Sequence, residues 1–69
     1  MEEGTVKSWD DVKGYGFIGR PGEMDVFLHI SEVKGRWRPQ REDLVSFDIE
    51  KDPNGRLRAK NVQLISFLD

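Results

Sequence analysis

The sequence lacks cysteine and has a single histidine among its 69 residues. Disulfide bridges are therefore excluded, and the Cys/His clusters that hold structural zinc cannot form. Paired carboxylates at the spacing of a calcium-binding loop are also missing. We expect no metal and no cofactor. A cysteine-free chain fits a reducing compartment, so we expect the protein to be cytoplasmic.

Long apolar runs are missing as well. No stretch approaches the ~20 apolar residues that cross a bilayer, so we expect no membrane contact by this segment. The first four residues are acidic and polar, which excludes a secretory signal within these residues. A chain of this length holds at most one small domain, expected over residues 1–69 with its core at about 4–66.

The sequence also lacks the arrangements that carry catalysis. Asp10 and Asp11 are adjacent and point apart in a turn or strand, and His29 lies inside a predicted strand without a nucleophile-elbow serine. The Gly14-x-Gly16 pair lacks the following helix that a phosphate-binding loop needs. We therefore expect a protein that is not an enzyme and takes no small-molecule substrate.

Charge of one sign does not dominate, because the formal net charge is −2. The charges nevertheless fall in blocks. Residues 33–41 contain only basic charged side chains, whereas residues 1–32 and 42–52 are both net acidic. Two interpretations remain open, a solvated surface of mixed charge or one basic face on the folded domain.

Five short segments have the composition and alternation of β-strands, at residues 4–9, 15–19, 25–30, 44–50 and 56–67. Turn signals separate them, and Ser31 is expected to cap a single helical turn. No stretch shows a helical period over about ten residues. Because closure removes exposed strand edges, we expect an all-β, five-stranded barrel.

Alternation along these strands divides the side chains into an inner and an outer set. Ser46 falls among the outer positions. After Ala59 the alternation of apolar and polar residues shifts by one position, which predicts a β-bulge near Lys60-Asn61. The expected core consists of Val6, Ile18, Val26, Leu28, Val45, Phe47, Ile49, Ala59, Val62 and Leu64.

Aromatic side chains recur at outer positions of two neighbouring strands. Tyr15 and Phe17 are two residues apart and share a face, and Phe27 and His29 do the same on the next strand. Core packing is the alternative, but aliphatic side chains already fill the inner positions. Exposed rings stack on nucleobases, at about 1–3 kcal/mol per base, with little regard to sequence. The four rings therefore predict a surface for single-stranded nucleic acid.

The tryptophans and nearby cations are candidates for the rim of this surface. Strict alternation places Lys7 and Trp9 outward, whereas a bulge near Ser8 turns Trp9 into the core, and both readings remain open. Lys13 and Trp37 are further rim candidates. The predicted phosphate contacts are Lys7, Lys13, Arg36, Arg38, Arg56 and Lys60.

Two motifs and both ends of the chain carry a resemblance to a known family. Residues 13–18, KGYGFI, are similar to one ribonucleoprotein motif, and residues 26–30, VFLHI, to a second. Residues 4–7 and 59–62 also fit the pattern. The sequence thus resembles a cold-shock domain. An RNA-recognition motif would carry the two motifs in the reverse order, with helices between them.

The resemblance implies a five-stranded antiparallel Greek-key barrel of the OB-fold type. It implies binding of single-stranded RNA or DNA with little sequence preference, by proteins that act as RNA chaperones or regulators of gene expression. Ser8 replaces a surface Trp of the family and Ile30 a platform Phe, so the ring surface is reduced. A similar pattern occurs as the N-terminal domain of some larger bacterial proteins with membrane-spanning C-termini. The matched binding residues are Lys7, Lys13, Tyr15, Phe17, Phe27 and His29.

Two functional hypotheses follow. In the first, a monomer binds single-stranded nucleic acid by stacking bases on Trp9, Tyr15, Phe17, Phe27 and His29. In the second, the same barrel is a protein-interaction module. An exposed Arg36-Trp37-Arg38 segment would then contact the partner, since Trp and Arg are enriched at binding hot spots.

Overall fold

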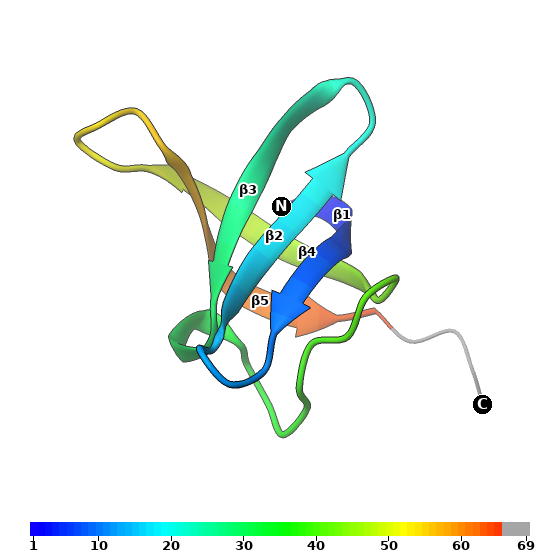
Figure 1. The fold of residues 1–69 in the computed structure, drawn as a ribbon. Coiled ribbons are helices and arrows are strands. Elements are labelled where there is room, and N and C mark those ends of the chain that lie inside the picture. Colours follow the sequence, from blue (N-terminus) through cyan, green and yellow to red (C-terminus); the bar gives the residue numbers. More distant parts are fainter. Residues whose placement is uncertain (66–69) are drawn as a thin grey trace.

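A computed structural model describes residues 1–65, which form five strands and one short 3-10 turn (Figure 1). The strand ends differ from the expected ones by a few residues, and the expected end of the last strand, Phe67, lies outside the described residues. The elements are β1 (Glu2–Asp10), β2 (Tyr15–Arg20), β3 (Glu23–His29), η1 (Ile30–Glu32), β4 (Leu44–Lys51) and β5 (Leu57–Leu64).

The strands close into a barrel in the order β1-β2-β3-β5-β4, which confirms the predicted all-β, five-stranded fold. β1 pairs with β2 on one side and with β4 on the other, both antiparallel. The last junction, between β3 and β5, is parallel and pairs Phe27 with Arg58. The hairpin between β4 and β5 projects away from the barrel (Figure 1). No helix in residues 1–65 is long and apolar enough to span a bilayer.

The core contains eight of the ten expected side chains. Ile49 is only partly buried and packs against this cluster. Leu64 is exposed, contrary to expectation. It is the last residue of β5, and the barrel wall that this strand forms ends there. Ser46 is buried although it was assigned to the outer set. Its short side chain lies in register between the longer side chains of Glu3 and Gln63.

The strand register shifts at three places in the barrel, and two of these shifts bear on the side chains discussed above. In β5 the register shifts between the pairs Asp48–Lys60 and Ser46–Gln63, so the bulge expected near Lys60-Asn61 is confirmed. Asn61 adopts a left-handed backbone, with φ of 53°. The extra residue lets Ala59 and Val62 both enter the core. In β1 the register shifts between Val6 and Ser8.

A single 3-10 turn follows β3, close to the helical turn expected there. The cap is not Ser31, as predicted, but His29, whose Nδ1 accepts a hydrogen bond from the Ser31 backbone N–H at 3.1 Å. A histidine ring can serve as the cap because an unprotonated ring nitrogen is an acceptor, like the oxygens that usually cap helices.

Candidate nucleic-acid interface

The first half of the candidate site lies on β2, where the alternation is strict. Gly16 and Ile18 point into the barrel and are buried, so Tyr15 and Phe17 point outward. These two rings are 37% and 38% exposed. A Cβ at Gly16 would collide with the backbone oxygen of Ser8. Glycine is therefore needed here for β1 to approach β2.

The second half lies on β3, in register with the first. Phe17 pairs with Phe27, and Tyr15 with His29. The ring centroids of Tyr15 and Phe27 are 5.8 Å apart, as are those of Phe17 and Phe27, and His29 lies 6.4 Å from Phe27. The four rings form one continuous outer surface, called the aromatic platform below. The structure thus brings together all four residues that the sequence assigned to it.

The ring of His29 is held in one orientation. Its Nδ1 accepts from the Ser31 backbone N–H and lies 2.9 Å from the Ser31 hydroxyl. A backbone N–H can only donate, so Nδ1 must be unprotonated and the proton of the neutral ring sits on Nε2. His29 therefore offers the platform a ring face and one N–H donor.

Trp9 lies off the platform. The bulge in β1 places Ser8 opposite Phe17 and Trp9 opposite the inward-facing Gly16. Trp9 is half-buried and packs against the core, and its Nε1 donates to Asp11 at 3.2 Å. Of the two readings that the sequence left open, the structure has the bulged one. Ser8, opposite Phe17, is the residue of β1 that faces the platform.

Trp37 also differs from its predicted setting. It is half-buried, packs against the core, and donates from Nε1 to the Lys34 carbonyl at 2.6 Å. These contacts fix the loop after η1 to the barrel. Trp37 is therefore not the exposed residue that the protein-interaction hypothesis assumed.

Several predicted cations are paired with carboxylates. Lys7 lies 3.1 Å from Asp25 beside the platform, and Arg38 lies 2.9 Å from Asp11. Lys13 is exposed and has no ion-pair partner within residues 1–65. Arg36 and Arg56 are likewise exposed and, among the described residues, have no ion-pair partner, so these two and Lys13 are the predicted cations that remain open to a phosphate.

Lys60, another of the predicted cations, contacts two carboxylates. Its Nζ lies 3.1 Å from a Glu32 carboxylate oxygen and 3.6 Å from one of Glu50. The hydrogen bond with Lys60 lowers the pKa of Glu32, and the same contact raises the pKa of Lys60. Hydrogen bonds from Arg38 and then Trp9 likewise lower the pKa of Asp11. These cations serve internal contacts in the free protein.

The match to known proteins agrees with this geometry. Residues 2–65 match the family described as "'Cold-shock' DNA-binding domain". The chain belongs to the cold-shock domain family. The match covers both ribonucleoprotein-like motifs and the whole barrel, so the resemblance noted from the sequence is confirmed. Cold-shock domains bind nucleic acid and catalyse no reaction, which confirms that this cold-shock domain is not an enzyme.

Bacterial relatives match this cold-shock domain along nearly their full length. It is 42% identical to the cold shock protein CspC of Bacillus subtilis, over 91% of this chain and 97% of that protein. It is 48% identical to the major cold shock protein CspA of Bacillus cereus, over 86% and 90% of the two chains.

A solved structure shares the fold. The structure described as "drosophila Unr CSD456" superimposes with a TM-score of 0.75 at 28% identity. The alignment covers 94% of this cold-shock domain but only 26% of that longer chain. The likeness therefore concerns one part of the longer chain.

One residue beside the platform was missed by the sequence reasoning. Arg58 on β5 is in register with Phe27 across the β3–β5 junction. The outward direction of its side chain could be predicted from the sequence, since the neighbouring Ala59 points inward. The place of Arg58 next to Phe27 could not, because the pairing of β3 with β5 joins segments far apart in the sequence.

Proposed function

We propose that this cold-shock domain binds single-stranded RNA or DNA with low sequence specificity, by stacking bases on Tyr15, Phe17, Phe27 and His29. It acts as an RNA chaperone or a regulator of gene expression, as a monomer in the cytoplasm. The observation that carries the proposal is the aromatic platform, whose ring centroids are spaced 5.8 to 6.4 Å apart across two strands.

The physical argument rests on solvent exposure. Tyr15 and Phe17 are each more than a third exposed although the core is filled by other side chains. Exposed aromatic rings that adjoin one another commonly mark a binding surface. Stacking needs no net positive charge, so it is compatible with a chain of net charge −2.

The test is a titration of fluorescently labelled oligo-dT and oligo-U strands, followed by anisotropy at low salt. We expect binding with a Kd below about 10⁻⁴ M. Phe17→Ala should weaken it, whereas Val12→Ala, at a 94% exposed position in the β1–β2 turn, serves as the matched control. No binding up to about millimolar strand, or equal affinity for both variants, contradicts the proposal.

The chaperone role is tested separately, with an RNA hairpin carrying a fluorophore and a quencher at its ends. A protein that holds single strands favours the open form, so fluorescence should rise on addition of the wild type and less with Phe17→Ala. Binding to oligo-U without any opening of the hairpin would leave nucleic-acid binding standing and contradict the chaperone role.

A further inference from the structure

Arg58 lies on the same face of the barrel as the aromatic platform. It pairs in register with Phe27, and residues paired directly across two strands project to the same side of the sheet. On β5, Leu57 packs against the core and Ala59 is buried, so Arg58 between them points outward. The outer surface therefore continues from the rings of β2 and β3 onto β5.

The charges around Arg58 leave its guanidinium open. Glu50 is its register partner on β4, and Glu32 lies close enough for the charge of Arg58 to help lower the pKa of that carboxyl. Both carboxylates are already engaged by Lys60, at 3.6 and 3.1 Å. Arg58 itself is exposed and has no carboxylate within 4.0 Å among the described residues. Lys60 contacts both acids, and Arg58 remains available.

We propose that Arg58 contacts a phosphate of the strand that stacks on the platform, and so extends the interface across the β3–β5 junction onto β5. This inference rests on the proposed function. A guanidinium matches the geometry of a phosphate and stays charged at every working pH. A strand whose bases stack on Phe27 has its backbone at the edge of that ring, where Arg58 lies in register.

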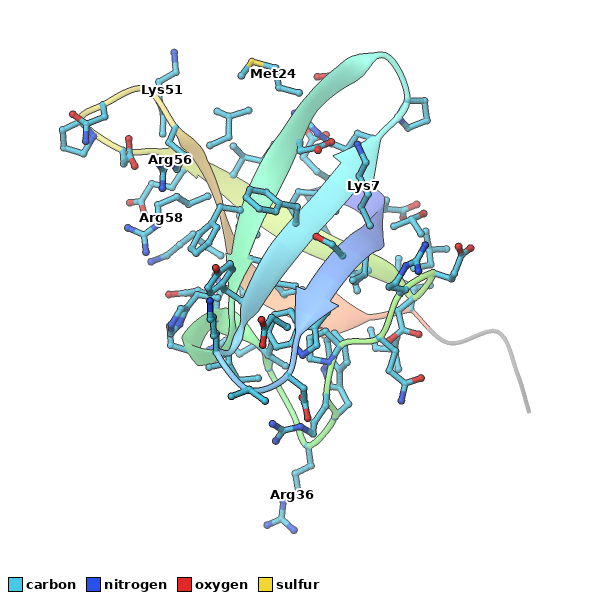
Figure 2. The ribbon with its side chains drawn as sticks, viewed as in Figure 1. Lys7, Met24, Arg36, Lys51, Arg56 and Arg58 are labelled. Atoms are coloured by element: carbon cyan, nitrogen blue, oxygen red, sulfur yellow. The ribbon has the colours of Figure 1, made fainter. Side chains whose placement is uncertain are left out.

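The hairpin supplies a matched control. Lys51 is exposed and lies on the same hairpin, but it is in register with Leu57, whose side chain packs against the core, and not with Arg58. Figure 2 shows Arg56 and Arg58 one above the other along the hairpin, and Lys51 directed away from both. Lys51→Gln thus removes the same charge from the same hairpin without touching the proposed contact.

The test measures the affinity for oligo-dT across a series of salt concentrations for four proteins. We expect Arg58→Gln to weaken binding about 5-fold or more at low salt, and to reduce the slope of log K against log salt by about 0.7, the value for one phosphate on a single strand. Arg58→Lys should keep the slope and stay within about 2-fold of the wild type. Lys51→Gln should behave like the wild type.

The outcomes separate this inference from the function on which it rests. If the wild type binds and Phe17→Ala weakens binding, but Arg58→Gln equals Lys51→Gln, the contact is wrong and the proposed function stands. If Arg58→Lys reduces the slope of log K against log salt as much as Arg58→Gln does, the phosphate contact is likewise wrong, because lysine keeps the charge on which the slope depends. If the wild type does not bind, both the proposed function and this contact are wrong.

Discussion

Phe27 is the residue on which the platform depends, because its ring lies beside the other three. It approaches Tyr15 at a tilt of 36°, Phe17 edge-on at 70°, and His29 at 36°. The rings therefore present faces in more than one direction rather than a single flat plane. Under the proposed function, a bound strand would bend to match these ring orientations, with successive bases stacked on different rings.

The contrast between Phe17 and Lys13 measures how much of the binding is stacking. We expect Phe17→Ala to cost about 1–3 kcal/mol of binding free energy, or roughly 5- to 150-fold in Kd. Lys13→Ala removes one exposed cation and should cost less. Isothermal titration with oligo-dT decides between them. Equal losses would show that charge, and not stacking, contributes most of the binding free energy.

The fold requires glycine at position 16, and this requirement can be tested separately from binding. Because an added Cβ would strike the Ser8 backbone oxygen, Gly16→Ala should destabilise the fold by about 1–3 kcal/mol or more. Gly19→Ala, on the same strand, meets only ordinary contacts, at 3.5 Å from Lys7 Cδ and 3.8 Å from Asp25 Oδ1. Urea unfolding compares the two. A similar loss of stability in both variants would contradict the close approach at Gly16.

The orientation of His29 gives a spectroscopic expectation. Since Nδ1 accepts from the Ser31 backbone, the neutral ring should be the Nε2–H tautomer. Two-bond ¹⁵N–¹H correlation spectra distinguish the tautomers directly. A neutral ring protonated on Nδ1 would show that the cap is not formed, and Ser31→Ala serves to test whether the hydroxyl contributes.

At the scale of the elements, bulges decide which faces the strands present. The β5 bulge was predictable because Val62 is apolar but, by strict alternation from the inward-facing Ala59, would point outward. The β1 bulge was not, because Ser8 and Trp9 can each stand on either face at similar cost. In the structure Trp9 pairs with Gly16, where a Cβ would meet the Ser8 backbone oxygen and the Trp9 Cα, so glycine lets the bulged strand lie close to β2.

The contact between Glu32 in η1 and Lys60 in β5 makes stability depend on pH. Folding lowers the pKa of Glu32, so this contribution is complete above its ordinary pKa of about 4.3 and is lost as pH falls through the lower, folded value. Folding raises the pKa of Lys60, so the same contact is complete below about 10.4 and is lost as pH rises through the higher, folded value.

We therefore expect the wild type to lose more stability than Lys60→Gln between about pH 5 and pH 3. Urea unfolding at a series of pH values measures the loss, and a carboxyl ¹³C titration should show the Glu32 midpoint rise in Lys60→Gln. A Glu32 midpoint that is the same in both proteins would contradict the ion pair. Because the Lys60 side chain is partly exposed, the effect should shrink as salt is added.

At the scale of the whole molecule, the sequence predicted the fold and the platform better than the electrostatics. Strand count, core and ring surface follow from alternation, which is local. The partners of charged side chains are not local: Lys7 meets Asp25 and Arg38 meets Asp11 only after the strands are arranged. The basic block at residues 33–41 accordingly did not show which cations remain open to a ligand.

This arrangement predicts weak salt dependence. If Lys13 and Arg58 supply about two phosphate contacts, log K should fall with log salt with a slope of about −1.4. Raising NaCl from about 50 to 200 mM should then weaken oligo-dT binding about 7-fold. Five contacts would give a loss of about 100-fold over the same range. A loss of that size would show that further cations contact the strand, either unpaired ones such as Arg36 and Arg56 or the ion-paired Lys7 and Arg38.

The parallel junction between β3 and β5 has a consequence for the motions of the barrel. The two strands are in register at Phe27 and Arg58, whereas β4 and β5 pair along most of their length. Opened at this seam, the barrel becomes one sheet in the order β3-β2-β1-β4-β5, with every antiparallel pairing intact. Amide hydrogens along the seam should therefore exchange with solvent through small openings, ahead of those between β1 and β2. A strand held by Phe27 on one side and Arg58 on the other would bridge the seam, so its binding should slow exchange there above all.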